Sequence, residues 1–271
     1  MTDSEYFIKI CGITTEEDAL LSVALGATAV GFVFAPSKRQ VAPRAVADIV
    51  KRLPPEVLRV GVFKDEAPER VSQICSHIGL NAVQLHGHES PTEVKWLAGR
   101  VPLVIKAFSA LDPRLSTAGE YEVFAILVDA AQPGSGVTFD WSHLASVPKG
   151  ERMILAGGLH PANVAAAIYN TGCFGVDVSS GVEKSPGRKD PIKLREFIDI
   201  ACRAFDERGS NASGGELAGG ANLMPERASR SPQSNPLRQN PPSPHSSRYP
   251  QTPVRRVTGS GRGPYDWQED K

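Results

Sequence analysis

The stretch Phe7-Ile8-Lys9-Ile10-Cys11-Gly12-Ile13-Thr14 joins a short apolar run to a Gly-Ile-Thr turn, and a helical pattern follows over residues 16–25. This order is typical of a buried parallel strand and its crossover helix. Side chains at the carboxyl ends of parallel strands face the ligand crevice. Cys11 stands at such an end. A lone cysteine more often only packs in a core, so the rest of the chain has to decide whether this thiol does chemistry.

The same strand and helix unit recurs eight times, up to about residue 204. Strands are predicted over residues 7–11, 29–34, 58–63, 82–85, 103–107, 124–129, 153–156 and 175–179. Helices are predicted over residues 16–25, 43–53, 67–77, 90–97, 112–118, 141–146, 161–169 and 190–205. Eight units predict an α/β protein with a (β/α)8 TIM barrel over residues 6–205. A doubly wound sheet is the alternative, but G-x-G-x-x-G is absent after the first strand.

The composition argues against a nucleic-acid or membrane partner. Lys plus Arg and Asp plus Glu both number 30, so no net field attracts a polyanion. No apolar run reaches membrane length, and the N-terminus lacks a basic region followed by an apolar one. The four cysteines have no metal-binding spacing and are expected to be free thiols. We therefore expect a cytoplasmic protein, whose oligomeric state no sequence feature specifies.

From residue 209 onward the composition changes. Residues 209–271 are rich in Pro, Ser, Gly and Arg, contain few aliphatic residues and show no hydrophobic periodicity. Such a segment cannot bury enough apolar surface to fold. We predict a disordered, mildly basic tail without a catalytic role.

Two glycine-containing segments follow the seventh and eighth predicted strands. The first carries Gly157 and Gly158, and the second runs from Asp177 through Ser179 and Ser180 to Gly181. Small residues there let backbone N–H groups approach an anion, and barrels often bind phosphate after these two strands. Either segment alone could be a simple tight turn. Together they predict a phosphorylated small-molecule ligand.

Three further side chains stand at strand ends or in the loops that follow. Asp129 ends the sixth strand as its only charge, so partial desolvation could let it hold a proton and act as a general acid. Cys11 is the complementary base if nearby cationic charge or backbone amides lower its pKa. Arg39 offers a planar fork suited to a carboxylate, although it could also be a solvated loop charge. The His86, His88 and Glu89 cluster is not interpreted as a metal site, because further ligands are missing.

Taken together, these segments resemble the phosphoribosylanthranilate isomerase family. The matching motifs, in the order of the family, are Lys9-Ile-Cys-Gly-Ile-Thr14, Gly31-Phe-Val-Phe34 with Ser37-Lys-Arg39, Val60-Gly-Val-Phe63, Val83-Gln-Leu-His-Gly87, Val128-Asp129, Thr138-Phe-Asp-Trp141, Ala156-Gly-Gly-Leu159 and Asp177-Val-Ser-Ser-Gly-Val182. The family usually has Lys before Thr-Phe-Asp-Trp, whereas this chain has Val137. The resemblance spans residues from about 6 to 205.

The resemblance implies an Amadori rearrangement in tryptophan biosynthesis. Cys11 would be the general base and Asp129 the general acid, Arg39 would hold the anthranilate carboxylate, and Asp177 would face the sugar hydroxyls. Proton transfer alone suffices, so neither a cofactor nor a metal is expected. The alternatives are another phosphosugar-binding barrel enzyme and a non-catalytic barrel that acts as a scaffold through its tail.

Overall fold

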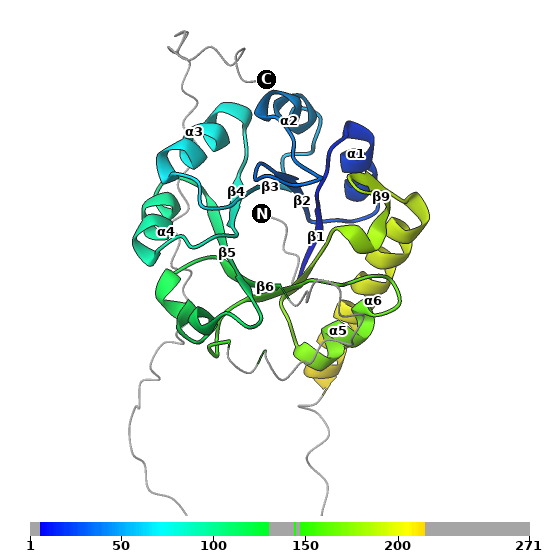
Figure 1. Ribbon diagram of the computed structural model, residues 1–271. Helices are drawn as coiled ribbons and strands as arrows, with labels where there is room; N and C mark the ends of the chain where they lie inside the picture. Colours follow the sequence, from blue (N-terminus) through cyan, green and yellow to red (C-terminus); the bar gives the residue numbers. More distant parts are fainter. Residues whose placement is uncertain (1–5, 130–143, 145–146, 215–271) are drawn as a thin grey trace, which may run out of the picture. The chain divides into compact units, whose positions relative to one another are not determined.

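The computed structural model describes residues 6–129, 144 and 147–214. Eight parallel strands close into a barrel in the order β1 to β8, each paired with the next and β8 with β1. Figure 1 shows the strands at the centre and the helices around them. The predicted (β/α)8 barrel is therefore confirmed.

The strands lie close to their predicted positions. They are β1 (Phe7–Cys11), β2 (Ala29–Val33), β3 (Leu58–Phe63), β4 (Ala82–Leu85), β5 (Leu103–Ser109), β6 (Ala125–Asp129), β7 (Met153–Ala156) and β8 (Gly175–Val178). The helices between them are α1 (Glu16–Ala24), α2 (Pro43–Val50), α3 (Pro68–Ile78), α4 (Pro91–Ala98) and α5 (Val164–Thr171), and α6 (Pro191–Gly214) follows β8. Proline at the first turn of α2, α3 and α4 favours a helix start there, because its missing N–H has no intrahelical partner at that position.

The pleat of the strands separates two hydrophobic clusters. Residues such as Ile8 and Ile10 point outward and pack with the helices, whereas Phe7, Ala29 and Val60 point into the barrel interior. Because side chains alternate, Lys9 and Cys11 lie on the same inward face as Phe7. Asp129 follows the inward Leu127 by two residues in the same way. The alternation thus brings the strand-end residues to one opening of the barrel.

Three elements differ from the sequence predictions. The helix expected over residues 112–118 is a 3-10 segment, η1 (Pro113–Tyr121), with a non-helical kink at Thr117. The last helix continues to Gly214, so the first residues assigned to the tail are helical. A short antiparallel hairpin of β9 (Glu183–Ser185) and β10 (Arg188–Lys189) lies between β8 and α6 and was not predicted. The helix expected over residues 141–146 falls, except for Leu144, outside the described residues, as does the tail from residue 215.

Candidate active site

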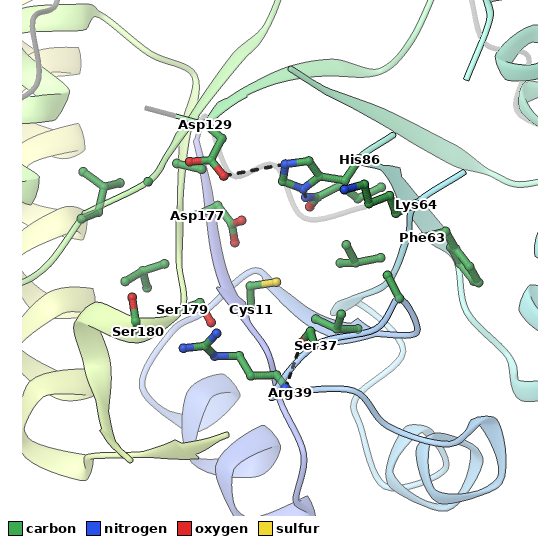
Figure 2. A pocket seen from close by; sticks show the side chains of 18 of the residues that line it. Cys11, Ser37, Arg39, Phe63, Lys64, His86, Asp129, Asp177, Ser179 and Ser180 are labelled. Atoms are coloured by element: carbon green, nitrogen blue, oxygen red, sulfur yellow. Dashed lines mark hydrogen bonds and ion pairs between the residues drawn. The ribbon is translucent and has the colours of Figure 1, made fainter. Parts of the chain in front are cut away.

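A cavity of about 410 Å³ opens at the carboxyl ends of the strands. This volume is in the range typical of small-molecule sites. Eight of the nine site residues predicted from the sequence line it: Cys11, Arg39, Asp129, Gly157, Gly158, Asp177, Ser179 and Ser180. Gly181 does not line it. Lys64 and His86 line it as well, and Figure 2 shows the His86 side chain beside Asp129.

Cys11 lies above a fully buried lysine on the same strand. The thiol points toward the centre of the cavity (Figure 2), and Lys9 has no exposed surface. Both side chains pass close to Gly31 on the neighbouring strand. A Cβ atom there would lie 3.0 Å from the Cys11 Sγ and 2.9 Å from the Lys9 Cε. Gly31 therefore makes the room in which the two side chains sit.

The groups around Cys11 shift the pKa of its thiol in opposite directions. Burial raises the pKa of the Cys11 thiol, the nearby Asp177 carboxylate also raises it, and the Lys9 and Lys189 ammonium groups lower it. Burial dominates, so the pKa of Cys11 is raised above its ordinary value. A lowered pKa is the condition under which the sequence predicts that Cys11 acts as a base. The neighbouring cations are present, but they only partly offset the desolvation of the thiol.

Asp177 lines the cavity and forms an ion pair with Lys9. Its Oδ1 lies 3.0 Å from the Lys9 Nζ, and its side chain is 9% exposed. Lys9 also donates a hydrogen bond of 2.8 Å to the Gln84 Oε1. A buried lysine with two acceptors keeps its charge, and the pKa of Lys9 is raised because Asp177 and Cys11 outweigh its desolvation. The cavity floor thus contains a fixed positive charge.

Gln84 connects this charge to the opposite wall of the cavity. Because the Gln84 Oε1 accepts from Lys9, its Nε2 faces His86, 3.3 Å from the ring Nδ1. An amide nitrogen only donates, so the Nδ1 accepts and the imidazole proton lies on Nε2. That nitrogen is 3.7 Å from the Asp129 Oδ2. Desolvation lowers the pKa of His86, with Asp129 opposing it, and burial therefore favours the neutral ring.

The loops after β7 and β8 contain glycines that turn the backbone toward the cavity and a glycine that lets the two loops pack together. Gly157 and Gly158 have φ angles of 87° and 66°, which favour glycine and let the backbone turn toward the cavity. At Gly181 a Cβ atom would lie 1.8 Å from the Leu159 oxygen. Gly181 therefore lets the two loops touch, and its position favours packing over direct ligand contact. The Ser179 hydroxyl is buried without a hydrogen-bond partner among the described residues.

Arg39 lies at the cavity edge and is not simply a solvated loop charge. Its Nε and Nη2 each donate a hydrogen bond of 2.7 Å to Glu183, and its side chain is 24% exposed. These bonds raise the pKa of Arg39. The sequence predictions did not include Glu183, because its partner lies far away along the chain.

Glu89 and His88, which were not interpreted from the sequence as part of a metal site, hold a loop. Glu89 accepts from the backbone N–H groups of Asp65 and Gly87 and pairs with the buried Lys106 at 3.0 Å. His88 lies against Asp65. Within the described part of the chain, no group of three or more His, Cys, Asp or Glu side chains is arranged to hold a metal ion. In the same residues, no helix is long and apolar enough to cross a membrane.

The comparisons with known proteins agree on one family. The family model for N-(5'-phosphoribosyl)anthranilate isomerase matches residues 8–200. The N-(5'-phosphoribosyl)anthranilate isomerase of Desulforudis audaxviator is 48% identical over 205 residues, which cover 73% of this chain and 98% of that protein. The crystal structure of the Thermotoga maritima enzyme is 46% identical, with a TM-score of 0.67, and the match covers 73% of this chain and 99% of that one.

A further solved structure is a phosphoribosyl anthranilate isomerase in complex with reduced 1-(o-carboxyphenylamino)-1-deoxyribulose 5-phosphate. It is 45% identical with a TM-score of 0.65, and the match covers 73% of this chain and 99% of that one. The relatives are thus matched over nearly their whole length by the barrel. This chain belongs to the N-(5'-phosphoribosyl)anthranilate isomerase family.

Proposed function

We propose that this chain catalyses the Amadori rearrangement of N-(5-phosphoribosyl)anthranilate to 1-(2-carboxyphenylamino)-1-deoxyribulose 5-phosphate in tryptophan biosynthesis. One observation carries the proposal. A thiol on β1 and a carboxyl on β6 face the same cavity, and the strands between them in the barrel, β7 and β8, carry the glycine loops suited to phosphate. Family membership supports the same reaction.

Asp129 is proposed as the general acid that opens the sugar ring. It donates a proton to the furanose ring oxygen as the bond from that oxygen to C1′ breaks. The lone pair of the anilino nitrogen forms the C1′=N bond of a Schiff base. His86 lies beside this carboxyl, with its Nε2 3.7 Å from the Asp129 Oδ2, and can restrict the orientations that the acid adopts.

Cys11 is proposed as the general base in the second step. Its thiolate removes the proton from C2′, the electrons of that bond form C1′=C2′, and the C1′=N pair returns to nitrogen. The resulting enolamine tautomerises to the ketone by losing the hydroxyl proton and gaining one at C1′. The buried Lys9 supports the role because its charge favours the thiolate. Even a small thiolate fraction is strongly nucleophilic and basic.

The remaining site residues are proposed to bind substrate. The backbone at Gly157 and Gly158 and the residues Ser179 and Ser180 would hold the phosphate, with Gly181 letting the two loops pack together. The Ser179 hydroxyl, which has no hydrogen-bond partner among the described residues, is a donor that an anion could satisfy. Arg39 would hold the carboxylate of the anthranilate, and Asp177 would face the sugar hydroxyls. The proposal also places the reaction in the cytoplasm, since all four cysteines are unpaired as in a reducing compartment.

The test is turnover by the purified full-length chain. The fluorescence of phosphoribosylanthranilate should disappear faster than it does spontaneously, and the rearranged product should form in equal amount. A chelator should leave the rate unchanged, because the proposed chemistry uses only proton transfer. Substrate loss at the spontaneous rate would indicate a non-catalytic barrel. A rate restored after chelation by one divalent metal would contradict the mechanism.

A further inference from the structure

The hairpin of β9 and β10 places two charged side chains in the interior. The side chain of Glu183 is 5% exposed and that of Lys189 is fully buried. The two residues are also paired across the hairpin. Burying charges is costly unless they are paired and fully hydrogen-bonded. The partners of these two residues therefore indicate what the hairpin does.

Glu183 uses both carboxylate oxygens. Its Oε2 accepts from the Arg39 Nη2, and its Oε1 accepts from the Arg39 Nε, each at 2.7 Å. The Oε1 also accepts from the Lys189 Nζ at 3.2 Å and from the backbone N–H of Gly187 at 3.3 Å. Two parallel bonds to one guanidinium fix its plane as well as its position. Glu183 is thus the residue that sets the orientation of the Arg39 head group.

Lys189 anchors Glu183 to the rim of the barrel. Besides its bond to Glu183, its Nζ donates to the backbone oxygen of Cys11 at 2.6 Å and to that of Ser179 at 3.2 Å. These oxygens lie at the ends of β1 and β8. The ion-pair network therefore rests on the two strand ends that carry the proposed base and part of the proposed phosphate loop.

The stem of Arg39 is confined separately. It crosses the turn after Cys11 so closely that a Cβ atom on Gly12 would lie 2.4 Å from the Arg39 Cδ. Gly12 also has a φ of 73°, which disfavours other residues. The stem is held by the turn and the head by Glu183. Figure 2 shows the guanidinium directed toward Ser179 at the cavity edge.

We propose that Glu183 is a positioning residue that presents Arg39 to the carboxylate of the substrate. This inference rests on the proposed function. A guanidinium has five N–H bonds, and the pair with Glu183 uses one on Nε and one on Nη2. Three N–H bonds remain to bind a second carboxylate. Because Arg39 is already held in place, its side chain loses less conformational entropy when the substrate binds.

The test is steady-state kinetics on Glu183→Gln in the full-length chain. Glutamine keeps the shape but loses the charge and one of the two acceptors. The KM for phosphoribosylanthranilate should rise about tenfold, while kcat stays within about threefold, because Arg39 grips a group that does not react. Asp48→Asn is the matched control, since it breaks an exposed pair with Lys51. It should change neither constant.

A double mutant separates positioning of Arg39 from a general structural effect. Once Arg39→Ala has raised KM, adding Glu183→Gln should raise it little further, because the two substitutions remove one interaction. Inhibition by inorganic phosphate should be equally strong in Glu183→Gln and wild type. A KM that rises multiplicatively in the double mutant, or phosphate inhibition weakened in step with KM, would overturn the inference. So would a wild-type KM in either single variant.

The failures of the two proposals are distinguishable. If the wild-type chain does not turn over the substrate, the proposed function fails. If it does and Glu183→Gln behaves like wild type, only the positioning role fails. Should Glu183→Gln not fold, Glu183→Asp keeps the charge beside Lys189 but cannot span both Arg39 nitrogens. Its KM should rise, and an unchanged KM would again overturn the inference.

Discussion

His86 presents its Nε2–H to the carboxyl of Asp129, with the nitrogen 3.7 Å from the Asp129 Oδ2. The tautomer follows from a chain of contacts that begins at the buried Lys9 and passes through the Gln84 amide. The same lysine lies beside Cys11. The two groups proposed to transfer protons are therefore oriented by one network across the cavity floor.

Removal of the imidazole should impair the acid step. In His86→Asn the side chain is too short to reach Asp129, so the polar contact that orients the acid is lost and kcat should fall about tenfold, which corresponds to about 1.4 kcal/mol. Steady-state kinetics with His77→Asn as control would measure this, because His77 is exposed on α3. A kcat equal to that of the control would show that His86 does not orient the acid.

Loss of the buried lysine should destabilise the barrel. Lys9→Met leaves the Asp177 carboxylate buried without its cationic partner, so the free energy of unfolding should fall by about 3–5 kcal/mol. Denaturant titration would measure it. Lys9→Met combined with Asp177→Asn should lose less, and Lys51→Met on the surface should lose under about 0.5 kcal/mol. Equal losses at the two lysines would contradict the assigned pairing.

The raised pKa of Cys11 determines how the reactivity of this thiol depends on pH. Iodoacetamide alkylates only the thiolate, and burial raises the pKa of this thiol, so the reactive fraction grows as pH rises. We expect the alkylation rate of Cys11 to increase by about one log unit per pH unit from neutral pH to beyond about 8.5, the ordinary thiol value. The measurement is the alkylation rate over this range in buffers of constant ionic strength, with Cys11→Ala as the control for the other three cysteines. An alkylation rate that levels off below that pH would contradict a raised pKa on the thiol.

The positions of the strands could be predicted from the sequence because each is a short apolar run bounded by turn residues. Most site residues could then be predicted as well, because parallel strands bring the residues at their carboxyl ends together. The η1 segment was predicted wrongly as an ordinary helix. Its apolar spacing fits a helix, but the backbone kinks at Thr117.

The hairpin and the buried charges could not be predicted in this way. Glu183-Lys-Ser and Arg188-Lys have no hydrophobic alternation, and their position is set by ion pairs to Arg39, which is distant in the sequence. Lys9 differs, because the sequence around it does carry a local signal. A lysine between isoleucines in a strand buried on both faces must point into the barrel and find a buried partner there.

Truncation should leave catalysis intact. The match to the Desulforudis audaxviator enzyme covers 98% of that protein with 73% of this chain, and the family model ends at residue 200. A chain that ends after Gly214 keeps all of α6. Its kcat and KM should lie within about twofold of the full-length values. A tenfold loss would show that the tail contributes to the site.

The central claim is that Cys11 and Asp129 transfer the protons, and kcat of Cys11→Ala and Asp129→Asn tests it most directly. Each variant should retain its fold by circular dichroism. Each should lose roughly 10² to 10⁴ in kcat, the usual contribution of a positioned acid or base. Cys75→Ala, a buried cysteine on α3 away from the cavity, is the control and should keep its kcat. A folded Cys11→Ala variant with near wild-type kcat would contradict the mechanism.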